Sequence, residues 1–150
     1  MIIMTEQIQT EPQKKKKKAI VTIGKRKKST ARATIIEGSG RVTINAKPLD
    51  IIQPKYLQMR LSEPIIIAGE RANSVDISVN VKGGGVWGQA NAARTAIANA
   101  LVKWTKDNKL KETYVDYDRS LLVSDPRRTE PHKPSRSTAG PRRSKQQSKR

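Results

Sequence analysis

Basic residues are concentrated at the two ends of this 150-residue chain, which confines any ordinary folded core to the middle. Residues 12–36 contain ten Lys or Arg and no acid, a local charge of +10, and residues 125–150 contain nine basic and two acidic residues, a local charge of +7. Residues 37–124 carry only +3. The nearly neutral middle can bury a core, whereas the two ends are suited to bind a polyanion.

The formal net charge of +18 favours a nucleic acid as the partner, with an anionic membrane surface as the second possibility. The chain contains no cysteine, so disulfides, thiolate nucleophiles and zinc sites built with Cys are excluded. The apolar run 1–4 is too short for a signal peptide or a membrane span, and we expect no transmembrane segment elsewhere.

Composition divides the chain into three parts. Residues 1–18 are expected to be a disordered basic extension, in which the lysine run 14–18 either contacts nucleic acid, aids solubility or acts as a nuclear address. Residues 19–123 are expected to fold. Residues 124–150, rich in Pro, Ser, Arg and Lys, are expected to form an extended basic tail that reaches roughly 85 Å if fully stretched.

Short β-branched runs predict the strands of the folded part. Residues 19–23, 31–37 and 41–45 are separated by the loop 24–30 and the turn 38–40, a spacing that favours an antiparallel meander. Strict alternation from Val75 to Lys82 predicts a further strand with one buried face.

Helical periodicity predicts the second layer. A stripe of apolar and small residues predicts a helix over 87–104, and a shorter amphipathic helix is expected over 107–117. Asp50 is expected to cap a helix that ends near Arg60, and the patch 65–67 is assigned to the core. The predicted fold is α+β: a two-layer arrangement of a mostly antiparallel four-stranded sheet with helices on one face, in the order β-β-β-α-β-α.

The sequence contains little that supports catalysis. The one histidine, His132, lies in the tail, so no transition-metal site can be assembled in the usual way and no metal or cofactor is expected. The run Gly83-Gly84-Gly85 is followed by Val-Trp-Gly-Gln, without the Lys and hydroxyl of a nucleotide-binding loop. Asp116 and Asp118 are interpreted as surface charges or partners of Arg119. We therefore predict that the chain is not an enzyme.

Contacts with phosphate are the expected mode of binding. The four consecutive cations from Lys25 to Lys28 lie in a predicted loop, and the glycine run precedes a helix whose free N–H groups can face an anion. The glycines can equally serve only a tight turn and close helix packing. There is no Phe and there are only two Trp and three Tyr, so binding by stacking bases on aromatic side chains is not indicated.

Three stretches together resemble the family of ribosomal protein nine of the small subunit. They are residues 24–33 (GKRKKSTARA), residues 83–90 (GGGVWGQA), and residues 125–130 (DPRRTE) followed by the terminal Ser148-Lys149-Arg150. Their order and spacing match from about residue 19 to the end. The segment 117–122 (YDRSLL) is more similar to the archaeal branch than to the bacterial one.

The resemblance implies a left-handed strand-helix-strand crossover and a place in the head of the cytoplasmic small ribosomal subunit. The implied partners are ribosomal RNA, neighbouring head proteins and peptidyl-site tRNA; no membrane contact and no homo-oligomer are expected. The implied ribosomal RNA contacts are Lys25, Arg26, Lys27, Lys28, Arg32, Gly83, Gly84, Gly85, Gln89, Arg127, Arg128, Lys133, Arg136, Arg142 and Arg143. The implied tRNA contacts are Ser148, Lys149 and Arg150.

The tail departs from the family pattern in two respects. Residues 133–143 are less rich in glycine than the family leads us to expect, and Gln147 replaces an aromatic residue. Two other functions remain as alternatives: a free nucleic-acid chaperone or chromatin-like protein, which the charge fits equally well, and a small nucleotide-binding enzyme, which the missing Lys and hydroxyl oppose.

Overall fold

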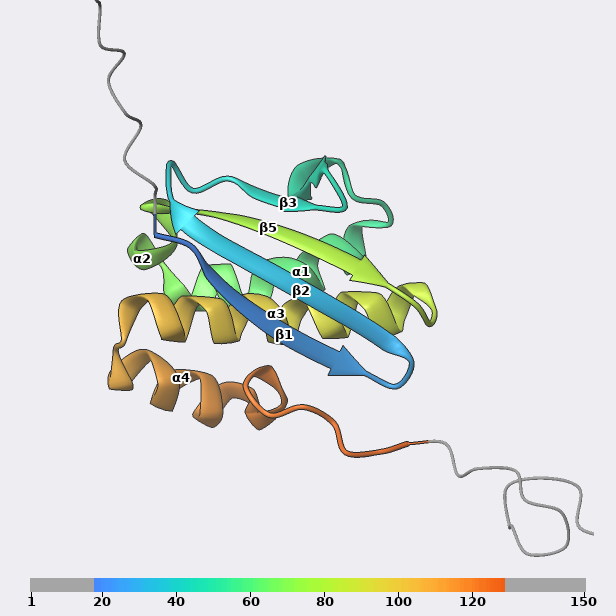
Figure 1. The fold of residues 1–150 in the computed structure, drawn as a ribbon. Helices are drawn as coiled ribbons and strands as arrows, with labels where there is room; N and C mark the ends of the chain where they lie inside the picture. Colours follow the sequence, from blue (N-terminus) through green and yellow to red (C-terminus); the bar gives the residue numbers. More distant parts are fainter. Residues whose placement is uncertain (1–17, 129–150) are drawn as a thin grey trace, which may run out of the picture.

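The computed structural model describes residues 18–128, which form one sheet covered on one face by helices (Figure 1). The sheet has five strands in the order β1-β2-β5-β3-β4. The strands are β1 (Ile20–Arg26), β2 (Ser29–Glu37), β3 (Val42–Ile44), β4 (Lys47–Pro48) and β5 (Val75–Lys82). The α-helices are α1 (Lys55–Ala68), α2 (Glu70–Asn73), α3 (Val86–Thr105) and α4 (Asn108–Asp118), and two short 3-10 turns are η1 (Leu49–Ile51) and η2 (Arg119–Leu121).

The sheet corrects two predictions: the antiparallel meander of the first three strands, and the total of four strands in a mostly antiparallel sheet. Strands β1, β2 and β5 are antiparallel neighbours, but β3 does not pair with β2: it lies on the other side of β5 and runs parallel to it. A fifth, two-residue strand, β4, pairs with β3. The prediction was wrong because short connections favour pairing of consecutive strands, whereas here β5 is inserted between β2 and β3. The left-handed crossover that the resemblance implies stays a prediction.

The α+β class and the helical layer are as predicted. Along β5, Val75, Ile77, Val79 and Val81 are buried, and the residues between them point away from the helices. Helix α3 spans one residue more at each end than the predicted range 87–104. Its small residues, Ala92, Ala93, Ala96 and Ala100 among them, are fully buried, so the helix axis lies close to the sheet.

Gly24 on β1 shows how close that approach is. A Cβ atom at Gly24 would lie 2.1 Å from the carbonyl oxygen of Ala92 and 2.7 Å from the nitrogen of Ala96, both in the backbone of α3. Two residues earlier, the buried hydroxyl of Thr22 donates to the carbonyl oxygen of Ala96 at 2.8 Å. These contacts fix β1, and the hairpin that continues from it, against the longest helix.

Helix α1 corrects the helix predicted to begin after Asp50. Asp50 lies in the turn η1; the helix begins at Lys55, after Pro54, and continues to Ala68 with Pro64 inside it. A helix-interior proline removes one hydrogen bond and costs about 3 kcal/mol. The buried stripe Leu57, Leu61, Pro64 and Ala68, spaced three to four residues apart, packs in the core and offsets this cost.

Helix α4 follows α3 after the turn at Lys106. Asp107 caps its N-terminus, and the Asp107 carboxylate accepts from the backbone nitrogen of Lys109 at 2.9 Å. The buried hydroxyl of Tyr114 donates to the carbonyl oxygen of Pro64 at 2.6 Å and joins α4 to α1. Burial raises the pKa of Tyr114 well above its ordinary value, and the nearby charge of Arg71 only partly opposes this. Within residues 18–128, no helix is both long and apolar enough to cross a membrane.

Candidate nucleic-acid interface

The four predicted loop cations lie on a tight hairpin. Strands β1 and β2 extend further than expected, and Arg26 pairs with Ser29, so only Lys27 and Lys28 form the turn. Lys25 and Arg26 therefore belong to β1, which corrects the predicted loop of residues 24–30. Lys27, with a backbone φ of 52°, and Lys28 are both exposed. The rigid pair of strands thus presents two lysines at its tip.

The glycine run packs directly against this hairpin. The hydroxyl of the buried Ser29 donates to the carbonyl oxygen of Gly83 at 2.9 Å. A Cβ atom would lie 2.6 Å from the carbonyl oxygen of Lys28 if added at Gly83, and 2.2 Å from the Ser29 hydroxyl if added at Gly84. Both glycines also have positive φ angles, which glycine adopts most readily. The glycine run therefore does form a tight turn, one of the two roles predicted for it.

Gln89 supports the glycine turn through its side chain. Its Nε2 donates to the carbonyl oxygen of Gly83 at 3.2 Å, which gives that oxygen a second donor besides Ser29. The turn leads into α3, whose first N–H groups have no acceptor within the helix and can face an anion. Gln89 therefore has a structural task at the position where the resemblance implied an RNA contact.

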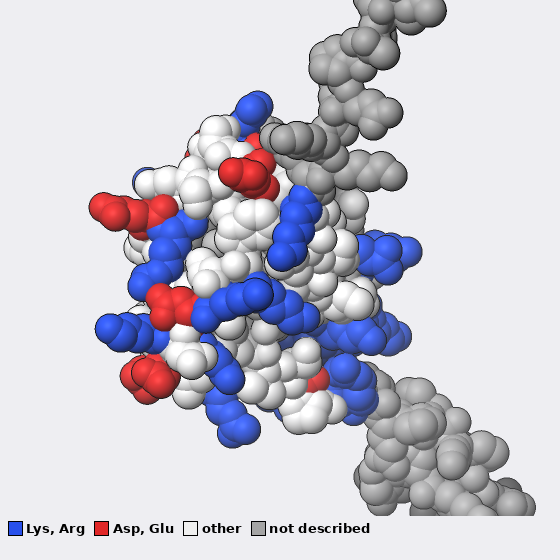
Figure 2. All heavy atoms as spheres, turned by 60° about the vertical axis from the view of Figure 1, so that its left-hand side comes forward, with Lys and Arg blue, Asp and Glu red and all other residues white. Residues whose placement is uncertain are grey.

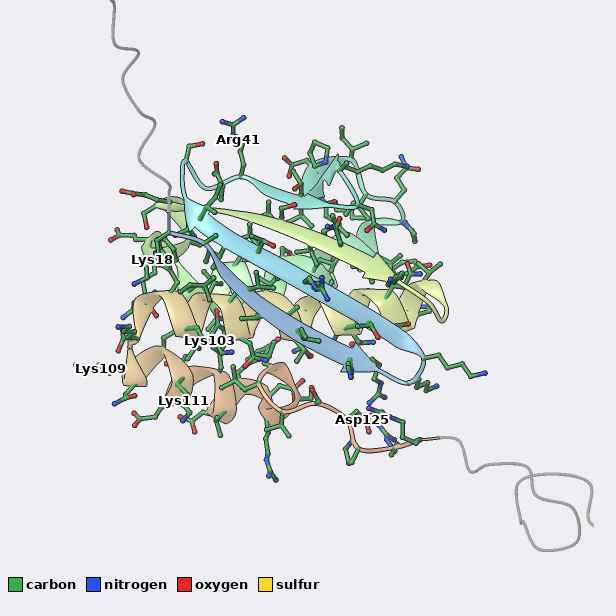
Figure 3. The ribbon with its side chains drawn as sticks, viewed as in Figure 1. Lys18, Arg41, Lys103, Lys109, Lys111 and Asp125 are labelled. Carbon is green, nitrogen blue, oxygen red and sulfur yellow. The ribbon has the colours of Figure 1, made fainter. Side chains whose placement is uncertain are left out.

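The root of the tail, residues 125–128, returns to the same hairpin. The Asp125 carboxylate contacts the guanidinium of Arg26 and also accepts from Arg127, at 3.1 Å from Nε and 2.8 Å from Nη2. The Nη1 of Arg128 donates to the carbonyl oxygen of Asp125 at 2.9 Å. Asp125 thus joins the start of the tail to β1, as its labelled position in Figure 3 shows.

Two hollows at this end gather residues from distant parts of the sequence. One, of about 480 Å³, is lined by Lys27, Lys28, Arg127 and Arg128 alone. The other, of about 410 Å³, is lined by Lys27, Lys28, Ser29, Gly84, Gly85, Val86, Trp87 and Gly88. Neither lining includes an acidic residue. We call the residues that line these two hollows the hairpin surface. It brings together the three motifs that sequence analysis had considered separately.

The opposite end of the domain differs in charge pattern. Figure 2 shows a face on which acidic side chains are interspersed among Lys and Arg. Exposed cations also occur there singly; Lys18, Arg41, Lys103, Lys109 and Lys111 lie away from the hairpin tip in Figure 3. The hairpin surface differs from that face because its four cations line one hollow together, without an acidic residue in the lining.

The remaining predicted contacts fall into two groups. Arg32 is exposed on β2, on the sheet face without helices, and lines a separate hollow with Thr30, Asn80 and Lys82. Lys133, Arg136, Arg142, Arg143, Ser148, Lys149 and Arg150 lie outside the described residues, as does His132. Within residues 18–128, no three His, Asp or Glu side chains are grouped to hold a metal ion.

Sequence analysis missed a buried charge beneath the tail root. Arg94 on α3 is only 2% exposed; its Nε lies 2.5 Å from Oε2 of Glu63 on α1, and its Nη1 lies 2.9 Å from Oδ2 of Asp118 at the end of α4. Asp118 is therefore a partner of Arg94 and not of Arg119, which corrects that part of the interpretation. No sequence signal marked Arg94, because arginine is normally exposed.

The environment of Asp118 shifts its titration. Burial alone would raise the pKa of this carboxyl, but hydrogen bonds from Ser120 and Arg94, together with the charge of Arg94, outweigh burial and hold the pKa below its ordinary value. Next to this pair, the hydroxyl of Thr95 donates to the carbonyl oxygen of Ser120, and the amide of Asn99 donates to that of Leu122, both at 3.2 Å. Helix α3 thereby directs the chain from α4 towards Asp125.

The sequence is similar to those of known ribosomal proteins. A family model described as ribosomal protein S9/S16 matches residues 24–150. The small ribosomal subunit protein uS9 of Methanococcus vannielii is 54% identical over 131 residues, which cover 87% of this chain and 98% of the relative. The uS9 proteins of Methanococcus maripaludis strains C7 and C5 are each 53% identical over 131 residues, with the same coverage. The expected resemblance, including its archaeal character, is confirmed, and the chain belongs to the ribosomal protein S9/S16 family.

Proposed function

We propose that this protein is a structural constituent of the cytoplasmic small ribosomal subunit, where it binds ribosomal RNA of the subunit head through the hairpin surface. The observation that carries the proposal is the meeting of Lys27, Lys28, Arg127 and Arg128 around one hollow without lining acids. Family membership and the names of the relatives, each a small ribosomal subunit protein, support the choice of partner. The proposal assigns no catalytic role to the chain.

The hairpin surface is suited to the phosphate backbone rather than to base edges. Lysine ammonium groups act as point charges towards phosphate, and arginine offers a planar fork to two phosphate oxygens. The glycine turn lets backbone N–H groups approach an anion without interference from side chains. Contacts of this kind fix position and orientation on RNA, which is the task of a structural constituent.

The tail is proposed to extend from this surface to the peptidyl-tRNA site. Asp125 fixes where the tail starts, and residues 129–150, which carry seven Lys or Arg, would follow ribosomal RNA from there. Ser148, Lys149 and Arg150 would contact phosphates of the tRNA anticodon stem-loop, as the resemblance implies. Ordering such a segment costs conformational entropy, so we expect it to become ordered as the RNA assembles around it.

Removing the four cations should lower both affinity for small-subunit ribosomal RNA and its salt dependence. In the variant with Lys27, Lys28, Arg127 and Arg128 all changed to Ala, each lost phosphate contact should reduce the slope of log affinity against log salt by roughly 0.7 to 0.9, or roughly 3 for all four. Filter binding of the full chain across a range of salt concentrations measures this slope.

A control removes the same charge elsewhere. Arg41, Lys103, Lys109 and Lys111 are also exposed but lie at the other end of the domain (Figure 3), so changing all four to Ala should leave most of the slope intact. Equal losses in both variants would show that binding follows net charge and not this surface. That result would favour the free nucleic-acid chaperone, as would sedimentation of the tagged protein away from small subunits at moderate salt.

Deleting Ser148 to Arg150 should separate assembly from tRNA binding. The deletion leaves every residue of the hairpin surface in place, so small subunits should still incorporate the protein at normal stoichiometry. The affinity of those subunits for tRNA at the peptidyl site should fall, because two cations that face tRNA phosphates are lost. Purified subunits and labelled tRNA provide the measurement; unchanged tRNA affinity would refute a role for the tail tip.

A further inference from the structure

Trp87 of the hairpin surface forms an exposed stacked pair with a second aromatic side chain, Tyr56. The rings of Tyr56 on α1 and Trp87 in the first turn of α3 have centroids 4.9 Å apart and planes 13° from parallel. Tyr56 is 53% exposed and Trp87 is 55% exposed. Each ring covers only one face of the other, and about half of each residue remains in contact with water. Uncovered aromatic surface next to a binding hollow indicates a ligand with a flat apolar face.

Trp87 belongs to the lining of the hollow that also contains Lys27, Lys28, Gly84 and Gly85. The amide of Asn91 donates to the carbonyl oxygen of Trp87 at 2.8 Å, which braces the first turn of α3. The hollow therefore combines two ammonium groups, a glycine backbone and an indole. A nucleotide has complementary parts, because its phosphate is anionic and its base is a flat π-system.

We propose that Trp87, backed by Tyr56, stacks on one unpaired RNA base while the adjoining phosphate is held by Lys27 and Lys28. The inference rests on the RNA-binding function proposed above and narrows the kind of RNA to a loop, bulge or single strand. Bases inside an A-form helix are stacked on one another and cannot be placed on an indole, whereas unpaired bases can be splayed out onto an aromatic ring. It also revises the expectation that aromatic stacking plays no part.

Charge favours RNA over a protein partner at this position. Val86, which is 63% exposed, lies in the same lining, and Met59, which is 56% exposed, follows Tyr56 by three residues on α1, so an apolar protein surface could cover part of the patch. The two lysines of that lining have no acidic neighbour within it, and burying them under an apolar surface would strip them of water without a counter-charge. RNA supplies that counter-charge through its phosphates, and its bases are flat rings that can stack on Trp87.

Tryptophan fluorescence can report the contact directly. The chain has two Trp, so in a Trp104→Phe background Trp87 is the only reporter. Titration of this full-length protein with a short oligoadenylate should quench its fluorescence as a base stacks on the indole. Inorganic polyphosphate, which has phosphates but no bases, should bind without comparable quenching. Equal quenching by both would mean that Trp87 senses only nearby charge, and the proposal would be wrong.

Substitution supplies the energetic test. Trp87→Ala should weaken oligoadenylate binding roughly 5- to 10-fold, the lower part of the range for one stacked base, and leave the salt slope and polyphosphate affinity unchanged. Trp87→Phe keeps a ring and should retain most of the affinity. Tyr117→Ala removes an aromatic side chain that is 59% exposed on α4, outside the hollow, and should change nothing.

The outcomes distinguish this inference from the function on which it rests. If Trp87→Ala keeps its circular dichroism spectrum and binds oligoadenylate and small-subunit ribosomal RNA like the parent, stacking at Trp87 is refuted while RNA binding stands. The same holds if that variant keeps RNA affinity but loses a subunit protein on co-purification. If the parent protein fails to bind small-subunit ribosomal RNA at all, the proposed function itself fails.

Discussion

Replacing Gly24 by Ala is expected to destabilise the fold by about 3 kcal/mol or to prevent stable folding, because overpacking against rigid atoms costs about 1–3 kcal/mol and sometimes more. The added Cβ would lie 2.1 Å from the Ala92 oxygen, which is backbone within α3 and cannot rotate away. Relief requires β1 to separate from the helix, and that movement would also stretch the hydrogen bond of Thr22 to Ala96. Urea denaturation of the full chain measures the loss.

The matched control adds the same methyl group where space exists. A Cβ atom added at Gly85 would meet no atom within 4 Å beyond its chain neighbours, and the φ of −104° at this residue is one that Ala adopts readily. Gly85 precedes α3 as the N-cap, where Ala is less favourable than Gly, so Gly85→Ala should cost less than about 1 kcal/mol. Equal denaturation midpoints for the two variants would contradict the close packing of β1 on α3.

Gly24 also connects packing to the proposed RNA surface. The hairpin tip is held in place by β1 on α3, by Ser29 on the glycine turn and by Arg26 on Asp125. A shift of β1 would therefore separate cations that the fold brings together from distant parts of the sequence. For this reason we expect a partly folded Gly24 variant to lose RNA affinity although it keeps every cation.

Local patterns predicted the elements whose periodicity is unbroken. The alternation from Val75 to Lys82 predicted β5 with its correct bounds, and the apolar stripe predicted α3 to within one residue at each end. Proline led to the wrong bounds for α1. Local rules end a helix before a proline, but burial of the apolar residues that continue through Pro64 to Ala68 offsets the cost of a proline inside the helix. Strand order failed for a different reason: the pairing of β3 with β5 depends on contacts across 35 residues, which no local pattern encodes.

The candidate site shows the same division between local and long-range information. Sequence analysis identified the hairpin cations, the glycine run and the start of the tail as separate motifs. Their meeting depends on Ser29 and Asp125, which lie within two of these motifs but were given no role of their own. Trp87 was predicted to lie at the start of a helix but was given no role in binding, because its exposure beside the lysines is a property of the tertiary fold. Composition thus predicted a nucleic acid as the partner, but it could not predict which residues form the hairpin surface.

Arg94→Met is expected to cost about 3 kcal/mol at neutral pH, since removing one member of a buried ion pair leaves uncompensated charge. Methionine keeps most of the volume but removes the cation that contacts both Glu63 and Asp118; Glu63 retains Arg60, whereas Asp118 loses its cationic partner. Arg60→Met is the control: it removes the other cation bound to Glu63, at 2.8 Å, but Arg60 is 36% exposed, so the cost should stay below about 1 kcal/mol. Denaturation midpoints compare the two.

The pH dependence should identify charge, rather than lost packing, as the cause. In the native protein the pKa of Asp118 is lowered, so its stabilising contribution is present above the unfolded pKa of about 3.8 and is lost as pH falls through the folded value. In Arg94→Met, Asp118 loses the hydrogen bond and the charge of Arg94 that help to hold its folded pKa down, so burial then raises that pKa and protonation relieves the cost of the unpaired carboxylate. The stability deficit of the variant should therefore be largest near neutral pH and shrink as the pH approaches 4.

Neutralising the carboxylates should rescue the variant for the same reason. Adding Glu63→Gln and Asp118→Asn to Arg94→Met replaces the two partly buried carboxylates by amides of similar shape, and replacing every charge of such a cluster is often neutral or stabilising. We expect the triple variant to regain most of the lost stability and to lose the pH dependence of the deficit. A deficit that is constant from pH 7 to 4 and persists in the triple variant would mean that Arg94 contributes through packing alone. The exit of the tail towards Asp125 would then owe its position to the hydrogen bonds of Thr95 and Asn99.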